Sequence, residues 1–487
     1  MYVMIEEMEY IMSEKEKNIN GRALRAGGWY IFNNFLQKGI VFITAPIFSR
    51  LLTKEEVGLV SNFQSWLTVL SIICSLDLYS SIQRSKLDFE EDLDGYLSSI
   101  LTLSTIVTLI FWINSIIFKE YICDLLGMTP ELMNFLFIYI LFYTAFNFLQ
   151  TKHRVCLEYK AFTVISISTT VLNFFAALTL VFLIKEKYWG KILGDNLPVL
   201  CISILLYLRI MIKGKKYFNK TYWTYALSLS VPLIPHHLAG NILSQFDRIM
   251  ITNICGYEKT AIYSMAYNVA LILSIVWSSF NGAWSPWFYE QLKKEEYEKI
   301  KKISDICILA FFIITLGLIT MGPEIILFMA PKSYYEGIYI IPIVLFGIFF
   351  QFIYSMYVNI EFYRKNTKYI PLGTMLSAGL NVLLNAVLIP KYGYAMAAYT
   401  TLAGYIFLYA FHFIISKRMI AKEIYNEKYI FKFIAFIPFV IMIYNYLYEK
   451  LVLRYVVSLV IILIILLINR KRWEDFFHNK KYFRRRG

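Results

Sequence analysis

The sequence is divided into blocks of roughly 20 mostly apolar residues, separated by short polar connections. Hydrophobic residues make up 58% of the 487 residues and charged residues only 17%. A block of this length crosses the ~30 Å hydrocarbon core of a bilayer as an α-helix, in which backbone groups bond to one another within the segment. Transmembrane β-strands would alternate apolar and polar residues with a period of two. The blocks therefore predict an all-α polytopic membrane protein.

The distribution of Lys and Arg among the loops indicates how many blocks cross the membrane. If the N-terminus is cytoplasmic, the loops on that side hold about three times as many Lys and Arg residues as the opposite loops, the asymmetry of the positive-inside rule. Both termini are therefore predicted to be cytoplasmic. Fourteen spans are predicted, at residues 27–49, 63–81, 97–118, 132–150, 162–184, 194–212, 225–245, 261–283, 303–329, 338–360, 370–389, 393–416, 429–448 and 451–469.

The two halves of the sequence repeat one another at an offset of 203 residues, so that segment 54–61 matches segment 257–264. Each copy holds six blocks, an even number, so both copies begin on the same side of the membrane. Such repeats are related by an axis along the membrane normal and are typical of transporters. The predicted organisation is an N-terminal cytoplasmic segment 1–20, six-helix lobes 21–215 and 222–417, an extra helix pair 429–469 and a basic cytoplasmic tail 470–487.

Motifs of soluble enzymes and nucleotide-binding sites are missing from the sequence. It contains no GxxxxGK[ST], HExxH or GxSxG pattern. The six cysteines are scattered without metal-ligand spacing. The acidic run 88–94 is read as a solvated charge run rather than a metal site. We expect no catalytic residues, no metal and no cofactor. The net charge of +14 is attributed to loops facing anionic lipid headgroups, not to nucleic-acid binding.

Polar residues inside the blocks are costly in a bilayer and therefore informative. Lys38 lies at the centre of the first block and shares a helix face with Asn34. The offset of 203 residues places His237 and Asn241 at the equivalent positions. Two lobes would present these stripes to each other across a substrate cavity; the alternative is ordinary hydrogen bonding between helices. In the second lobe the stripe continues along one predicted helix as His237, Asn241, Gln245 and Arg248.

Other ionisable residues lie near the ends of the blocks. Arg25, Arg50, Arg84 and Arg154 are candidates for the mouths of the cavity, or they extend to the headgroups. The acids expected to couple transport to a proton or cation are Asp77, Asp247 and Glu361. Asp247 has a simpler alternative role, as half of an ion pair with its neighbour Arg248. His236 and His412 are read as packed rather than functional.

Three segments resemble one family of membrane transporters. Residues 46–58 read PIFSRLLTKEEVG, residues 245–251 read QFDRIMI and residues 283–288 read AWSPWF. With the two lobes and the extra helix pair, the chain resembles a polysaccharide repeat-unit flippase of the multidrug/oligosaccharidyl-lipid/polysaccharide exporter superfamily. Val57 replaces the aromatic residue that the first motif usually carries.

The resemblance implies a fold and an activity. The fold is a V of two six-helix lobes, like that of the multidrug exporters. The activity is movement of undecaprenyl-pyrophosphate-linked oligosaccharides, for O-antigen or exopolysaccharide, across the bacterial plasma membrane. A polysaccharide polymerase and a chain-length regulator are the expected partners. The alternatives are a lipid II flippase, a cation-coupled drug exporter and, more remotely, a membrane glycan polymerase or ligase.

Overall fold

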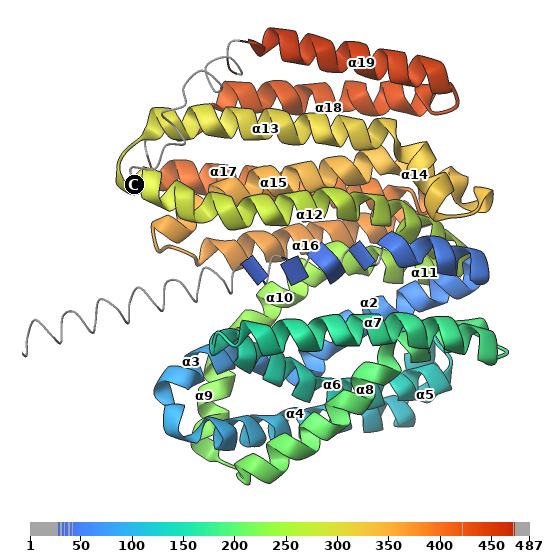
Figure 1. The fold of residues 1–487 in the computed structure, drawn as a ribbon, viewed down its shortest axis with the longest axis vertical. Coiled ribbons are helices and arrows are strands. Elements are labelled where there is room, and N and C mark those ends of the chain that lie inside the picture. Colours follow the sequence, from blue (N-terminus) through green and yellow to red (C-terminus); the bar gives the residue numbers. More distant parts are fainter. Residues whose placement is uncertain are drawn as a thin grey trace, which may run out of the picture. The chain divides into compact units, whose positions relative to one another are not determined.

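Every regular element that the structure describes is a helix (Figure 1). The computed structural model describes residues 28, 29, 32, 33, 35–37, 39, 40, 42–420, 422–470 and 472. Within these residues, twelve helices are long and apolar enough to cross a membrane. The prediction of an all-α polytopic membrane protein is confirmed.

Two of the fourteen predicted spans are not among these twelve helices. The first, 27–49, includes positions outside the described residues. The second, 225–245, is interrupted by proline-containing and π-helical turns, so no single long helix covers it. The predicted span 303–329 is also broken, at Met321, because the following Gly322 and Pro323 begin a new helix. The total of fourteen spans stays a prediction.

The described chain forms two compact units. Of the described residues, unit 1 contains those up to Thr44 and 62–238, and unit 2 contains 45–61 and those from Ala239 onwards. These bounds differ from the predicted lobes, since unit 2 includes a short segment from the first half and unit 1 includes the beginning of the seventh block. The lobes defined by the sequence repeat stay a prediction.

Unit 1 is built around helices that pack closely through small residues. An added Cβ on Gly194 would lie 2.1 Å from the Cα of Ala177, so only glycine permits this approach. The elements of this unit are α2 (Lys54–Ser75, which begins in unit 2), η1 (Leu78–Ser81), α3 (Ile82–Asp88), η2 (Glu90–Asp92), α4 (Leu93–Ile117), α5 (Lys119–Leu126), α6 (Pro130–Val155), α7 (Tyr159–Leu183), α8 (Lys187–Gly214), α9 (Lys220–Ser230), η3 (Val231–Leu233) and most of α10 (Ile234–Asn241).

Unit 2 contains the more deeply buried helices, with α15 at its centre. Helix α15 packs against α12, α13, α17 and α18. The elements of this unit are the π-helical turn η4 (Ile242–Phe246), α11 (Asp247–Cys255), α12 (Tyr257–Lys293), α13 (Tyr297–Thr320), α14 (Gly322–Met329), η5 (Lys332–Ile340), α15 (Ile341–Tyr363), α16 (Tyr369–Tyr392), α17 (Met396–Met419), α18 (Glu427–Leu447) and α19 (Leu451–Ile468).

The first family-like motif, 46–58, explains how α2 starts. Thr53 and Glu56 form a reciprocal capping box, with Thr53 N to Glu56 Oε2 at 2.8 Å and Glu56 N to Thr53 Oγ1 at 3.2 Å. Gly58 allows α2 to contact the start of α12, because an added Cβ would lie 1.9 Å from the backbone oxygen of Tyr257. Arg50 donates to the backbone oxygens of Leu327 and Phe328 at the end of α14. The motif therefore has a structural function in unit 2.

The extra helix pair is attached to unit 2 through a buried arginine. In Figure 1, α18 runs beside α13, and α19 runs beside α18. Arg454 of α19 is 1% exposed, forms an ion pair with Glu324 of α14 and donates to Tyr448 O at 2.9 Å. Beside it, Ser458 bonds the hydroxyls of Thr320 and Tyr444. Arg454 makes the sequence of α19 less apolar, but it holds α19 against α14 and the end of α18.

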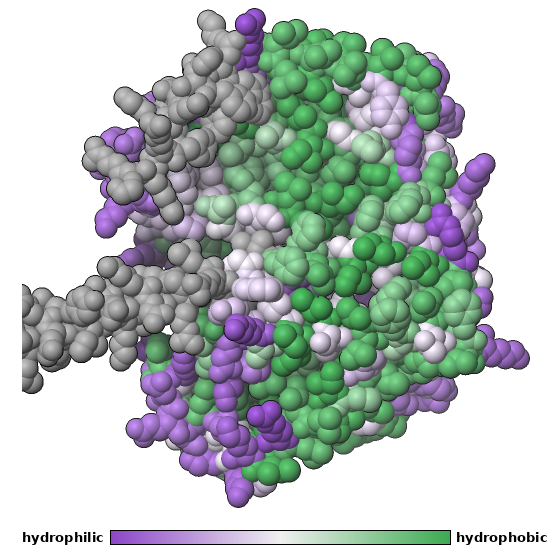
Figure 2. All heavy atoms as spheres, viewed as in Figure 1, coloured by the Kyte–Doolittle hydropathy of each residue, from purple (hydrophilic) through white to green (hydrophobic). Residues whose placement is uncertain are grey.

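The visible face of each unit is largely hydrophobic, and hydrophilic residues gather towards the helix ends (Figure 2). Helix α19 leaves Val452, Leu467 and Ile468 more than two-thirds exposed. Exposed apolar side chains in this number are expected where a helix faces lipid.

Candidate functional site

Part of the predicted cavity lies outside the described residues. Arg25, Asn34 and Lys38 are among those positions. Their pairing with the equivalent stripe of the second copy stays a prediction.

The seventh predicted span, residues 225–245 (the seventh block), is not one continuous helix. The prediction of a single helix there was wrong. Pro232 and Pro235 lack the N–H groups that a helix interior needs, and a 3₁₀ turn separates α9 from α10. A π-helical turn, η4, then separates α10 from α11. The wider π turn shifts the register of the following residues. His237, Asn241, Gln245 and Arg248 therefore do not form one α-helical stripe.

His237 pairs with a predicted coupling acid, Asp77, within unit 1. After α2 ends at Ser75, Leu76 and Asp77 adopt left-handed φ angles of 50° and 53° and turn the chain into η1. The Asp77 carboxylate is 0% exposed and accepts hydrogen bonds from His237 Nδ1 at 2.8 Å and Ser80 Oγ at 2.7 Å. The His237 side chain is 36% exposed. This hydrogen bond connects the turn after α2 to α10 in the seventh block.

Asp247, the second predicted coupling acid, is buried among neutral partners in unit 2. Its side chain is almost fully buried, at 1% exposed. Oδ1 accepts from Asn385 Nδ2 at 2.7 Å and weakly from Asn381 Nδ2 at 3.4 Å. Oδ2 accepts from Tyr263 Oη at 2.6 Å and from Thr401 Oγ1. We call these five residues, from α11, α12, α16 and α17, the Asp247 cluster.

The neighbouring Arg248 bonds elsewhere. Its Nε donates to Ser264 Oγ at 3.2 Å, its Nη1 donates to Gln245 Oε1 at 3.0 Å, and its guanidinium lies 4.7 Å from the centre of the Tyr267 ring. Among the described residues, no salt bridge joins Arg248 to Asp247. The Asp247 carboxylate is thus held by neutral donors.

The chemistry of the Asp247 cluster suits a small hard cation or a proton. A buried carboxylate that has hydrogen-bond donors but no ion-pair partner still has a desolvation penalty. Protonation or a bound monovalent cation removes that penalty. Carboxylate, amide and hydroxyl oxygens are the ligands that hard cations prefer. Within the cluster, the amide oxygen of Asn385 accepts a hydrogen bond from the hydroxyl of Thr400.

The third predicted acid, Glu361, is buried with a histidine. Glu361 Oε1 and His412 Nδ1 are 2.6 Å apart, and both side chains are 0% exposed. The ring of Tyr354 stacks on His412, with centroids 5.8 Å apart. All three predicted coupling acids are therefore buried and hydrogen-bonded.

The arginines predicted for the cavity mouths have different surroundings. Arg50 binds the end of α14, and the guanidinium of Arg154 lies 5.4 Å from the centre of the Phe162 ring. Arg84 is exposed and pairs with Asp88 at 3.1 Å. The Tyr225 hydroxyl, donating at 2.6 Å, and then Arg84 hold the pKa of the Asp88 carboxyl below its ordinary value.

The acidic run 88–94 binds basic residues of unit 1. Asp94 pairs with both Lys152 and Lys213 at 2.7 Å, and Asp92 pairs with Lys216 at 2.5 Å. The run therefore fastens the linker between the predicted lobes to α4 and α6. Among the described residues, no group of three or more His, Cys, Asp or Glu side chains is arranged to hold a metal ion.

Sequence reasoning missed the partners of the buried acids. Asn381 and Asn385 are spaced i, i+4 on α16, a pattern that places two amides on one face of an apolar helix. That spacing could have indicated a polar contact on this face of α16. Thr401 gives none, because hydroxyls are common in membrane helices as hydrogen-bonding groups.

Comparison with known proteins identifies the family. The model of the polysaccharide biosynthesis protein family matches residues 23–291, over half of the chain. The chain belongs to this family. This family agrees with the resemblance drawn from the three sequence segments.

Relatives of this family member include membrane proteins of bacteria and archaea. The Lsg locus putative protein 1 of Haemophilus influenzae is 28% identical over 360 residues, which cover 72% of this chain and 86% of the relative. An uncharacterized membrane protein of Methanocaldococcus jannaschii is 23% identical over 457 residues, covering 86% and 88%.

Solved structures share the fold of this family member. The lipid II flippase MurJ in an inward closed conformation superimposes with a TM-score of 0.59 at 16% identity, covering 92% of this chain and 99% of that chain. An inward-facing multidrug resistance transporter of the MATE family gives a TM-score of 0.55 at 13% identity, covering 80% and 94%. The MATE-like part of the fold prediction is confirmed.

Proposed function

We propose that this chain moves undecaprenyl-pyrophosphate-linked oligosaccharide repeat units from the inner to the outer leaflet of a bacterial plasma membrane by alternating access. Its membership of the polysaccharide biosynthesis protein family supports the substrate class. The observation that carries the transport mechanism is the Asp247 cluster, a buried carboxylate with neutral hydrogen-bond donors. The described part of the chain holds twelve candidate spans.

The obstacle to this movement is the polar headgroup of the lipid. Bringing a pyrophosphate and several sugars through hydrocarbon removes their hydration, which is prohibitive for unpaired charge. A water-filled cavity with fixed cations lowers that barrier, because charge-assisted bonds replace hydration. Lys38, supported by Asn34 and Arg25, is the proposed phosphate ligand. The polyprenyl tail can stay in lipid throughout.

The Asp247 cluster supplies the coupling in this proposal. When a proton or monovalent cation neutralises Asp247, the amides and hydroxyls of α16 and α17 are held around it. When the site empties, the unpaired carboxylate favours a different arrangement of α11 against these helices. Since η4 links α11 directly to α10, occupancy of the cluster changes the seventh block, where the chain passes from unit 1 to unit 2. Asp77 and Glu361 are the further coupling candidates.

A deletion strain provides the test in cells. Loss of the gene should abolish surface polysaccharide while lipid-linked repeat units accumulate inside, and plasmid-borne wild type should restore export. Lys38→Ala, inserted normally in the membrane, should not restore export. Full export by that variant would contradict the role of Lys38. Co-purification with a polysaccharide polymerase and a chain-length regulator would identify the proposed partners.

A second candidate substrate is lipid II. The structural similarity to the lipid II flippase MurJ over 92% of the chain favours it. The two substrates are distinguished by the deletion phenotype, because loss of a lipid II flippase blocks cell-wall synthesis and is lethal, whereas loss of repeat-unit export leaves the cell wall intact.

A further inference from the structure

Helices α12 and α15 of unit 2 face each other with matching polar stripes. Both stripes recur at every fourth residue, the spacing that places side chains on one helix face. Neither contains a charged side chain. The stripe of α12 is Trp277, Asn281, Ser285 and Tyr289, and the stripe of α15 is Gln351, Ser355, Asn359 and Tyr363.

Hydrogen bonds join the two stripes into a ladder. Trp277 Nε1 donates to Ser355 Oγ at 3.2 Å. The hydroxyls of Ser285 and Tyr289 donate to Asn359 Oδ1 at 2.9 and 3.1 Å. We call these two stripes the α12–α15 ladder. Asn359 is buried, but Ser285 and Tyr289 are only half-buried, so the ladder has an open edge along α12.

A backbone carbonyl lies along this edge without its helical donor. Pro286 has no N–H, so the oxygen of Gly282 cannot receive the usual i to i+4 bond. Gly282 and Pro286 are both exposed. A carbonyl freed in this way is satisfied by a neighbouring side chain, by water or by a polar ligand. This edge of α12 can therefore accept a hydrogen bond from a polar ligand.

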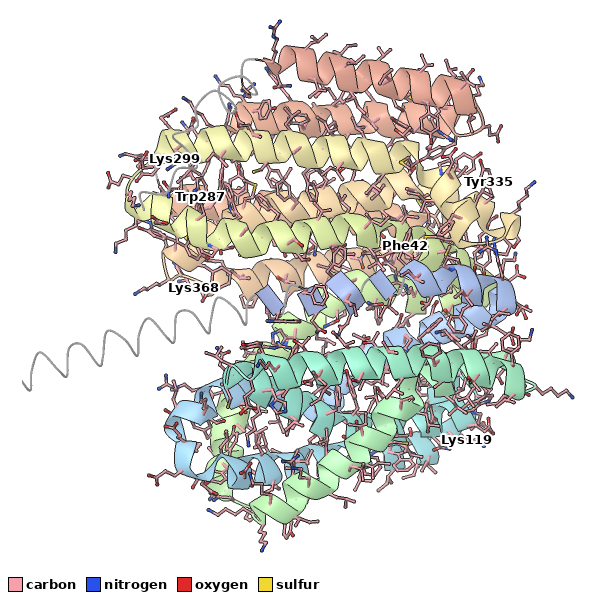
Figure 3. All side chains as sticks on the ribbon, in the orientation of Figure 1. Phe42, Lys119, Trp287, Lys299, Tyr335 and Lys368 are labelled. Carbon is pink, nitrogen blue, oxygen red and sulfur yellow. The ribbon has the colours of Figure 1, made fainter. Side chains whose placement is uncertain are left out.

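The position along α12 agrees with entry of a substrate from the cytoplasm. Trp287, half-buried on α12, lies towards the same end of unit 2 as Lys299 and Lys368, and Tyr335 lies towards the opposite end (Figure 3). Lys299 and Lys368 belong to loops predicted to be cytoplasmic, and Tyr335 to a loop predicted to be outside.

We propose that the α12–α15 ladder is a neutral glycan-binding subsite. It rests on the proposed function, in which the pyrophosphate is bound elsewhere by cations. Sugar hydroxyls bond Asn281, Ser285 and Tyr289 and donate to the carbonyl of Gly282. Amides, hydroxyls and an aromatic ring without charge match uncharged hexopyranose units and give no advantage to an isolated phosphate.

The test is the rate of flipping in proteoliposomes with two substrates. One carries the complete oligosaccharide on polyprenyl pyrophosphate, and the other carries a single sugar. Asn281→Ala combined with Tyr289→Phe should slow the complete substrate by about tenfold, the effect of two lost hydrogen bonds, and leave the single-sugar substrate unchanged. Tyr425→Phe is the matched control, because it removes a buried hydroxyl that bonds Met356 O of the same α15.

Each outcome has one meaning. Equal rates for the double variant and wild type, or an equal loss with both substrates, would overturn the subsite and leave the ladder as a contact between helices. A wild-type protein that flips neither substrate would instead overturn the proposed function. A selective loss for the complete substrate, with thermal unfolding unchanged, supports the subsite.

Discussion

At the scale of single residues, the most consequential feature is a carboxylate without a cation. Asp247 is buried, and its hydrogen-bond donors are an alcohol, a phenol and amides. Arg248 acts on this carboxylate through its electrostatic field but forms no ion pair with it, so a proton or a cation that enters the cluster would compensate the charge more fully. The same residue type in unit 1, Asp77, has a histidine instead. Asp77 and Asp247 are thus held by different chemistry, whereas Glu361 of unit 2 has a histidine as Asp77 does.

The first prediction concerns thermal stability. A cation that binds the folded Asp247 cluster at 100 times its Kd should stabilise wild type by about 2.7 kcal/mol. Asp247→Asn should remove this dependence on cation and raise the melting temperature in cation-free buffer, because the unpaired charge is gone. Scanning fluorimetry in detergent, with sodium, potassium or a change in pH, measures both effects.

The control for this prediction is Asp305→Asn. Asp305 is a buried acid of the same unit that already pairs with Arg472 at 3.0 Å. This variant should keep the wild-type response to cation. An Asp247→Asn variant that is stabilised as strongly as wild type would contradict a cation site at Asp247.

Sequence reasoning identified the acids but not their environments. Asp77, Asp247 and Glu361 stand out because acids are rare in apolar blocks. Their partners come from helices up to 160 residues away, as with Asp77 and His237. Such pairing is set by helix packing, which no local pattern encodes. His412 was expected to be packed, and it is buried, but for this reason its partner Glu361 was not predictable.

At the scale of elements, helix ends and breaks were partly predictable. Thr53 and Glu56 have the spacing of a capping box, and Pro232 and Pro235 indicate a kink. The π-helical turn after α10 has no sequence signature of this kind. It arises where the chain leaves unit 1 and the side chains of α11 bond within unit 2.

The second prediction concerns the contact between α2 and α12. Gly58→Ala places a Cβ against the backbone oxygen of Tyr257, and backbone cannot move aside as a side chain does. The expected loss of stability is about 2–3 kcal/mol. Gly379→Ala is the control, because nothing lies within 4 Å of its added Cβ; helix propensity there predicts a gain of up to about 1 kcal/mol. The change in unfolding free energy, measured in detergent, should therefore be a loss for Gly58→Ala and a gain for Gly379→Ala. Equal stability of the two variants would contradict the tight contact.

The third prediction concerns the attachment of α19. Arg454→Leu should leave Glu324 without its partner and cost about 2 kcal/mol, less than a fully buried pair because Glu324 is 36% exposed. Adding Glu324→Gln should recover most of that loss. A double-mutant cycle on thermal unfolding measures the coupling. Independent, additive losses would show that the pair does not fix α19.

At the scale of the whole molecule, composition decided the fold class before any motif was considered. Twelve of the predicted blocks each overlap one of the long apolar helices in the described part of the chain. Short motifs gave the first resemblance, and the match of a family model to residues 23–291 assigned the family. The bounds of the two compact units were not predictable, because the exchange of residues 45–61 and 222–238 between the halves depends on three-dimensional packing.

The fourth prediction concerns topology. With fourteen spans, single cysteines introduced at Lys119 and Lys332 should react with an impermeant maleimide added outside intact cells, and those at Lys299 and Lys368 should react only after permeabilisation. The background is a chain whose six native cysteines are replaced. Labelling of Lys299→Cys from outside would contradict the fourteen-span topology.

The measurement that tests the central claim most directly is reconstituted flipping under an ion gradient. Purified protein in liposomes receives a fluorescent polyprenyl-pyrophosphate oligosaccharide, and a membrane-impermeant quencher reports its leaflet. We predict that wild type transfers the lipid faster when a proton or sodium gradient is imposed, and that Asp247→Asn transfers it at one rate with or without the gradient. Transfer by wild type no faster than in protein-free liposomes would contradict the proposed function, and an Asp247→Asn variant that still responds to the gradient would contradict its mechanism.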